Sequence, residues 1–215
     1  MSNAHPPRRD LLRMGLASAV AAPAWLTPPL ARAAPATRPL HPTPAQTEGP
    51  YYPVQLPADQ DGDLLRNGAV HYRHGTPVWL EGVVSDTAGT PVRGVQVEIW
   101  QCDHQGHYHH PGDGGRADPA FQGFGRVTVD RQGHYRFRTI RPAPYSGRTP
   151  HIHVKVRLGT RELLTTQLYV AGDPGNARDF LWRHLRSEAD RAALTVPFRP
   201  GAQGLQARFP IVLAL

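Results

Sequence analysis

Two histidines stand one residue apart in His151–Arg157 (HIHVKVR), a β-branched, alternating stretch that predicts a strand. Side chains at i and i+2 of a strand point to the same face, so we expect His151 and His153 to lie together and Ile152 to face the other way. Two imidazoles held like this can bind one metal ion. A lone His-x-His pair is also typical of solvated strand histidines, and the chain has 12 histidines, so the pair needs partners.

Two tyrosines are candidate partners for the histidine pair. Tyr145 precedes His151 by six residues, in a loop rich in proline and glycine (142–148, PAPYSGR). Tyr108 follows the predicted end of a strand at 97–103 (VEIWQCD). The sequence therefore offers two phenols and two imidazoles from separate parts of the chain.

At these residues the chain resembles the intradiol ring-cleavage dioxygenases, the family that includes protocatechuate 3,4-dioxygenase and catechol 1,2-dioxygenase. The resemblance spans about residues 44–174 and is strongest where both tyrosines and the His-x-His pair occur in order. Four stretches carry it: 47–53 (TEGPYYP), 97–103 (VEIWQCD) with 106–108 (GHY), 145–153 (YSGRTPHIH), and 165–169 (TTQLY) with 172–173 (GD).

The resemblance implies a mononuclear, non-haem Fe(III) centre. Its four protein ligands map onto Tyr108, Tyr145, His151 and His153, and all four residue types are present. Phenolate oxygen suits a hard ferric ion, and the charge of the metal lowers the pKa of a bound tyrosine. Two phenolates and one hydroxide balance three positive charges, which favours the ferric state.

Further site residues are implied by the same resemblance. Arg148 matches an arginine that lies against the substrate ring, where its permanent charge can stabilise an anion. Gln167 matches a glutamine beside that arginine. Tyr51 and Tyr52 fit a pocket wall, although packing of the N-terminal arm explains them equally well. His107 fits a pocket lining or a solvated loop.

The implied reaction is O2-dependent cleavage of a catechol-type diol between its two hydroxyl-bearing carbons, giving a cis,cis-muconate-type diacid. In this reading Tyr145 is the ligand that the substrate displaces. The partners are then a small aromatic diol and O2, and we expect a homo-oligomer. The ring substituent of the substrate stays open.

Short strands separated by Gly/Pro turns must position these residues. The spacing predicts an all-β fold, an antiparallel β-sandwich with long loops and one short helix near 176–193. The segments 126–130 and 134–140 are expected to form a hairpin around the turn 131–133. The other predicted strands are 78–85, 95–100, 151–157, 163–170 and 208–215.

Composition narrows the class of protein. The net charge of +7 comes almost wholly from scattered arginines, Lys155 being the only lysine, so we expect no nucleic-acid surface. We expect no membrane span in the mature protein. The chain has a single cysteine, Cys102, which excludes an intramolecular disulfide and fits a partly buried small residue following a strand.

The N-terminus resembles an export signal. After Ser2-Asn3-Ala4, typical of a cloning scar, Arg8-Arg9 precedes a weakly apolar stretch and the small residues Ala31-Arg32-Ala33. We interpret residues 1–33 as a twin-arginine signal that sends the protein to the periplasm or outside. Residues 34–50 are then an extended arm, and 51–215 the catalytic β-sandwich.

Two alternatives stay open. A zinc or copper enzyme could use the same histidines, but no Cys-x-x-Cys or His-Glu-x-x-His motif occurs. A secreted, non-catalytic β-sandwich binding module would also fit the stretch 80–95, but it needs no tyrosines in step with His151 and His153.

Overall fold

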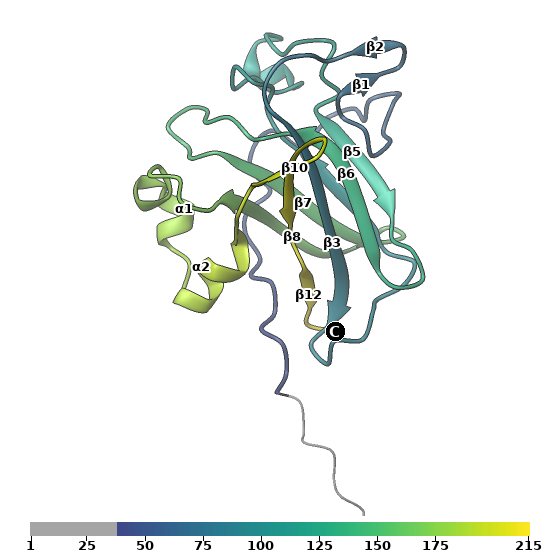
Figure 1. The fold of residues 1–215 in the computed structure, drawn as a ribbon, viewed down its shortest axis with the longest axis vertical. Coiled ribbons are helices and arrows are strands. Elements are labelled where there is room, and N and C mark those ends of the chain that lie inside the picture. Colours follow the sequence, from purple (N-terminus) through teal and green to yellow (C-terminus); the bar gives the residue numbers. More distant parts are fainter. Residues whose placement is uncertain (1–37) are drawn as a thin grey trace, which may run out of the picture. The chain divides into compact units, whose positions relative to one another are not determined.

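The computed structural model describes residues 38–215, which contain two five-stranded sheets and a short hairpin at one end (Figure 1). The predicted export signal lies outside the described residues. The mostly β architecture confirms the predicted sandwich class. The hairpin joins β1 (Arg66–Asn67) and β2 (Val70–His71).

The first sheet has the strand order β5-β4-β7-β8-β9. All its pairings are antiparallel except that of β8 with β9. Its strands are β4 (Gln96–Trp100), β5 (Phe124–Thr128), β7 (His151–Leu158), β8 (Arg161–Val170) and β9 (Thr195–Val196). Trp100, His153 and Gln167 are directly opposite one another on β4, β7 and β8, so one rung of this sheet carries two of the predicted site residues beside Trp100.

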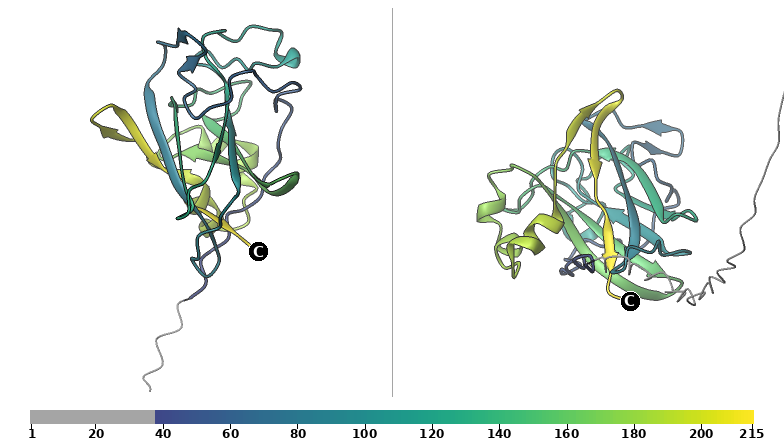
Figure 2. Two further views of the ribbon diagram at one scale, coloured as in Figure 1. Left: turned by 90° about the vertical axis from the view of Figure 1, so that its right-hand side faces the viewer. Right: turned by 60° about the horizontal axis from the view of Figure 1, so that its bottom comes forward.

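The second sheet is built around the long strand β3 (Pro77–Asp86). It pairs antiparallel with β6 (His134–Ile140) on one side, and parallel with β11 (Gly204–Arg208) and β12 (Ile211–Leu213) on the other. β10 (Arg199–Gly201) pairs only with β11, and this yellow hairpin projects beyond β3 in Figure 2. The C-terminal segment thus completes a sheet begun much earlier in the chain.

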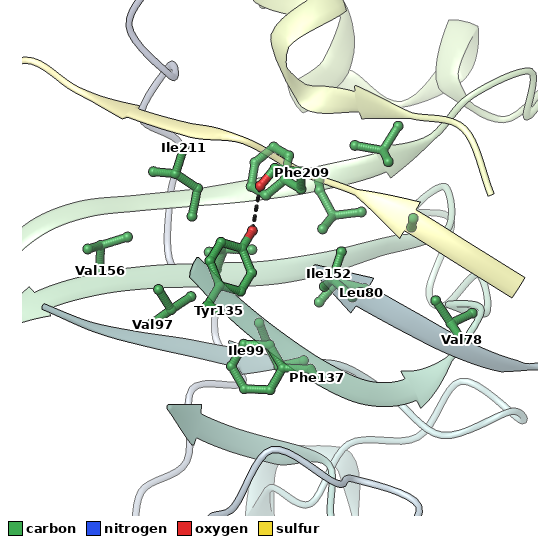
Figure 3. Packing of buried hydrophobic residues seen from close by; sticks show 14 of the residues in the cluster. Val78, Leu80, Val97, Ile99, Tyr135, Phe137, Ile152, Val156, Phe209 and Ile211 are labelled. Atoms are coloured by element: carbon green, nitrogen blue, oxygen red, sulfur yellow. Dashed lines mark hydrogen bonds between the residues drawn. The ribbon is translucent and has the colours of Figure 1, made fainter. Parts of the chain in front are cut away.

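Apolar side chains from the facing sides of both sheets form the core (Figure 3). On β4 and β7 the residues alternate, so that Val97 and Ile152 enter the core while Trp100 and His153 lie on the opposite, outer face. This confirms the predicted faces of His-x-His. The hydroxyl of Tyr135 donates to the carbonyl oxygen of Phe209 at 2.6 Å inside the core.

The hairpin predicted for 126–130 and 134–140 is wrong. β5 pairs with β4 and β6 pairs with β3, so the two strands belong to different sheets. Asp130 holds the tight turn between them, because its Oδ1 accepts from the amides of Gln132 and His134. The turn is therefore a corner of the sandwich, and the strands diverge as soon as they leave it.

The single helix expected near 176–193 is three short pieces: a 3₁₀ turn at Asn176–Arg178, α1 (Phe180–Arg183) and α2 (Glu188–Leu194). The loop after β4 holds a further 3₁₀ turn, Pro111–Asp113. Among residues 38–215, no helix has the length and apolar character needed to cross a membrane.

Residues 40–52, here called the strap, run from the second sheet, where the amide of Thr43 donates to the carbonyl of Val212, past β8 and onto the outer face of the first sheet (purple in Figure 1). They form no strand or helix, yet they are held by specific hydrogen bonds. The amide of Gln46 donates to the carbonyl of Thr165, and the hydroxyl of Thr166 donates to the carbonyl of Pro44. The strap therefore covers the face that carries His151 and His153.

Candidate metal centre

The paired histidines are buried on β7, with 1% and 0% of His151 and His153 exposed. Their Nε2 atoms lie 3.2 Å apart. The Nδ1 atom of His151 lies 2.7 Å from the carbonyl oxygen of Thr149, so Nδ1 carries the proton and Nε2 the lone pair. Two nitrogen ligands on neighbouring positions of one cation, each at about 2.1 Å, are about 3 Å apart, so the spacing suits a shared metal ion.

Both candidate tyrosines lie against these histidines. The ring centroids of Tyr108 and Tyr145 are 4.9 Å apart. Tyr145 lies 5.2 Å from His151, and Tyr108 lies 6.0 Å from His153, measured between the same points. The loop after β4 and the loop before β7 thus bring four rings together, as the sequence predicts.

Burial keeps both imidazoles neutral at pH 7. It lowers the pKa of His151 to about 4 and the pKa of His153 well below its usual value, and the charge of Arg148 adds to both effects. A neutral imidazole is the form that binds a metal through its lone pair. The histidines are therefore in a ligating state without help from a cation.

The phenols are neutral for the same reason. Burial raises the pKa of Tyr108 well above its usual value and also raises that of Tyr145, where Arg148 opposes the shift. The Tyr108 hydroxyl is fully buried and makes no hydrogen bond of normal geometry, although the Tyr145 hydroxyl interacts with it; such a buried polar group is rare. A cation at this position would ionise both phenols and satisfy that oxygen. The donor set therefore fits ferric iron.

The residues described here contain no group of three His, Cys, Asp or Glu side chains able to hold a metal ion. A carboxylate- or thiolate-rich zinc site of the usual kind is thus missing from residues 38–215. Any metal bound by His151 and His153 would need the phenols as its other protein ligands.

Arg148 is held beside the phenols by two polar side chains. Its Nε donates to Asp179 Oδ2 at 2.7 Å, and one of its terminal nitrogens donates to Gln167 Oε1 at 2.8 Å. Burial alone would lower the pKa of Arg148, but the hydrogen bond and charge of Asp179 raise it instead. Gln167 donates in turn to the carbonyl of Thr47 in the strap, at 3.0 Å.

Asp179 is a site residue that sequence reasoning missed. It is 1% exposed and also accepts from the amides of Thr149, Leu181 and Trp182, so it caps α1 as well as holding Arg148. Burial would raise its pKa, but the hydrogen bonds, first that of Arg148, lower it. An Asp before an apolar helical run indicates a cap, but nothing in the sequence indicates Arg148.

The three predicted pocket residues lie in different surroundings. The ring of Tyr51 stacks on that of Tyr108, with centroids 4.7 Å apart. The hydroxyl of Tyr52 donates to Glu98 at 2.9 Å, and its ring packs edge-on against Trp100, with centroids 5.0 Å apart. The Nδ1 atom of His107 lies 3.5 Å from the carboxylate of Asp113, which also accepts from the backbone amide of Tyr108.

A cavity of about 690 Å³ opens beside Tyr145 and Arg148. The loop 141–150 forms one wall and Asp173–Gly175 another. A separate hollow of about 110 Å³ is lined by Tyr108, Tyr51 and Trp100. The larger cavity gives a small molecule a route to the Tyr145 phenol.

The family model described as "Dioxygenase" matches residues 47–214, which is most of the chain. The protocatechuate 3,4-dioxygenase beta chain of Burkholderia cepacia is 37% identical over 162 residues, 66% of this chain and 67% of that one. A hydroxyquinol 1,2-dioxygenase of Corynebacterium glutamicum is 32% identical over 150 residues, covering 61% of this chain. This chain spans only 47% of that relative's length.

Solved structures agree in fold. A dioxygenase domain from Streptomyces sp. SirexAA-E, part of a fusion with a carbohydrate-binding protein, has a TM-score of 0.64 at 33% identity, covering 81% of this chain and 99% of that one. Catechol 1,2-dioxygenase from Acinetobacter sp. ADP1 has a TM-score of 0.61 at 29% identity, covering 80% and 62%. Family match, relatives and fold coincide over the segment that brings the four rings together, and the chain belongs to the intradiol ring-cleavage dioxygenase family.

Proposed function

We propose that the protein uses ferric iron and O2 to open a catechol-type diol between its hydroxyl-bearing carbons, giving a cis,cis-muconate-type diacid. Tyr108, Tyr145, His151 and His153 would hold the iron. The observation that carries this proposal is the convergence of four rings around a buried phenol oxygen without a hydrogen bond of normal geometry and two facing imidazole nitrogens. A non-catalytic binding module needs none of these groups, so we do not favour it.

Bound ferric iron would supply the Lewis acidity that makes the diol reactive towards O2. The chain's own contribution begins with its two phenols, which differ in accessibility. Tyr108 is 2% exposed, whereas Tyr145 lies on a loop that borders the larger cavity. We assign Tyr145 the role of proton acceptor: its phenolate oxygen takes a proton from a diol hydroxyl as the substrate enters.

Tyr108, His151 and His153 would keep their places throughout the reaction. The strand geometry and the bond from His151 to the carbonyl of Thr149 fix the first imidazole. Arg148 would stabilise negative charge on the diol, because its guanidinium stays protonated at any working pH. Asp179 and Gln167 orient that guanidinium from two directions.

The Tyr108→Phe variant tests the ligand set. A phenolate bound to ferric iron gives a visible charge-transfer band, so the iron-loaded variant should lose part of this band and most of its ring-cleaving activity. Tyr135→Phe is the matched control, because Tyr135 is an equally buried tyrosine that bonds only to Phe209 in the core. Iron-loaded Tyr108→Phe with unchanged colour would exclude the assignment.

The substrate class needs a separate measurement. Relatives are named for protocatechuate, hydroxyquinol and catechol, so we propose a small aromatic diol of this kind. Oxygen uptake by iron-loaded protein, screened over diphenols, would identify it. Product spectra would separate cleavage between the hydroxyls from cleavage beside them, and the second outcome would contradict the proposal.

Two further proposals concern the export of the protein and its assembly. We propose that Arg8-Arg9 directs the protein through the twin-arginine route, and that the mature protein forms a homo-oligomer. Replacing both arginines by lysine should retain the protein in the cytoplasm, as cell fractionation would measure. Light scattering of the mature protein would test the oligomer.

A further inference from the structure

Lys155, the only lysine of the chain, is buried next to the proposed metal centre. It lies on β7 two residues after His153, so both side chains are on the outer face of the sheet. Its side chain is only 4% exposed. A buried ammonium is costly unless charges or hydrogen bonds compensate it, so its surroundings require an explanation.

Two elements provide the compensation. The strap contributes the carboxylate of Glu48, which pairs directly with the ammonium, and the ring of Tyr52, whose centroid lies 4.0 Å from Nζ. The neighbouring strand β8 contributes Glu162, whose Oε2 lies 3.4 Å from Nζ. Lys155 thus joins the strap to the first sheet, with Glu162 as a second partner that does not belong to the strap.

The strap contacts three of the proposed site residues. The ring of Tyr51 stacks on Tyr108, and the carbonyl of Thr47 accepts from Gln167. Gly49 lies so close to His153 that a Cβ atom there would be 3.4 Å from its Cε1. A shift of the strap would therefore reach a phenol, an imidazole and the glutamine that bonds to Arg148.

The orientation of the His153 ring depends on packing contacts more than that of the His151 ring does. The Nδ1 of His153 is buried without a partner, unlike the Nδ1 of His151, so no hydrogen bond would fix the plane of its ring once Nε2 binds a metal ion. Instead the ring stacks on Trp100, with centroids 4.7 Å apart and planes 10° apart. The Lys155 ammonium lies 5.8 Å from the ring of Trp100, and Tyr52 packs edge-on against it.

We propose that Lys155 is a positioning residue: by pairing with Glu48 and lying on Tyr52 it fastens the strap to β7, and so fixes Tyr51 on Tyr108 and the Trp100–His153 stack. The fastening of the strap stands on these contacts alone. Its bearing on the metal rests on the proposed function.

Hydrogen exchange of the protein tests the fastening without any metal. The amide of Gln46, bonded to Thr165, reports on the strap. Glu48→Gln removes the strap's charge from Lys155, and we expect this amide to exchange about tenfold faster, since the contact with the ammonium loses its ionic acceptor and is weakened. Glu162→Gln is the matched control, because it removes a similarly exposed carboxylate from the same ammonium while glutamine still offers an acceptor to the Thr165 hydroxyl, and exchange should stay unchanged.

Lys155→Met should raise strap exchange as much as Glu48→Gln does. In the double variant Lys155→Met/Glu48→Gln the second change should add nothing, because both remove one contact. If the two carboxylate variants have equal effects, or if their effects add to that of Lys155→Met, Lys155 only balances charge and the proposal fails. Glu48→Gln decides the matter even if Lys155→Met does not fold.

The tyrosinate-to-iron band supplies the second readout. Iron-loaded Glu48→Gln should show a shifted band and a raised KM for the diol with kcat little changed, whereas Glu162→Gln should match the unaltered protein. A loosened strap with an unshifted band would show that the strap does not position the ligands. If the unaltered protein itself has no such band, the proposed function fails, and the exchange result still decides the fastening.

Discussion

At Asp179 a single buried carboxylate orients Arg148 and caps α1. We predict that Asp179→Asn lowers kcat/KM for the diol by about tenfold to a hundredfold, because Arg148 loses its charged partner. Asparagine caps helices well, so α1 should persist. Steady-state kinetics measure this, and Ser187→Ala, which removes only the cap of α2, is the control. If kcat/KM fell equally in both variants, the loss would come from helix capping and not from the orientation of Arg148.

The buried thiol of Cys102 should make the free energy of unfolding depend on pH in the alkaline range. Burial raises its pKa to about 12, whereas an unfolded chain has a thiol pKa of about 8.5. Because the thiol pKa is higher in the folded protein than in the unfolded chain, the folded state holds the proton more tightly. This stabilisation is fully present at pH values below the unfolded pKa and is lost as the pH rises towards the folded pKa. Between pH 9 and 11 the free energy of unfolding should therefore fall more steeply, by up to about 1.4 kcal/mol per pH unit, than in Cys102→Ala. Parallel urea-unfolding series measure this, and equal slopes would contradict it.

The sequence predicts which rings lie together but not what orients them. His151 and His153 are two residues apart on one strand, and strand periodicity alone places them on one face. Arg148 and Asp179 are separated by 31 residues, and Lys155 and Glu48 by 107. Such pairs depend on how loops cross the sheet, which no local pattern records.

Among the elements, the strap passes beside His153 at Gly49, whose φ is +76°. Gly49→Ala should destabilise the fold by about 1–2 kcal/mol, because an L-residue is strained there. The new methyl would also lie 3.4 Å from His153, so iron affinity should fall. Gly159→Ala is the control: its φ is +57° and its Cβ would meet open space. Metal titration should separate the two variants, and equal iron affinity would contradict the prediction.

Strand positions are predictable from alternation and turn residues, and the strands observed at β3, β4, β7 and β8 follow that prediction. Strand partners are not. The turn sequence at 131–133 is compatible both with a hairpin and with a connection between two sheets. The hairpin prediction is therefore wrong here, where Asp130 holds a corner of the sandwich. The helix near 176–193 divides because Asp179 and Ser187 each begin a new short helix.

Across the whole molecule, the C-terminal segment closes the second sheet by parallel pairing with β3. The bond from Tyr135 to the Phe209 carbonyl holds the junction between β11 and β12. Tyr135→Phe should cost about 1–3 kcal/mol, because a buried carbonyl loses its partner. Chemical denaturation measures this, and the colour and activity of iron-loaded protein should not change. A variant as stable as the unaltered protein would contradict it.

This topology exceeds what the sequence predicts. The predicted sandwich class is correct, but three of its strand pairings are parallel and join segments far apart in the chain. The sequence marks 208–215 only as a strand, and its partner β3 begins 131 residues before Arg208. Pairing between distant segments depends on how the two sheets bury their facing sides against each other. A pattern of neighbouring residues does not contain that information.

The rung of Trp100, His153 and Gln167 has a consequence for tolerance of insertions and deletions. Because successive side chains alternate, one residue inserted between Ile152 and His153 would put the two imidazoles on opposite faces and turn Val154 out of the core, so that core and proposed metal centre would fail together. Beyond Val156 the pairing of β7 with β8 already shifts register. Changes in chain length are therefore compatible with a working enzyme only past that irregularity, in the turn that follows Leu158.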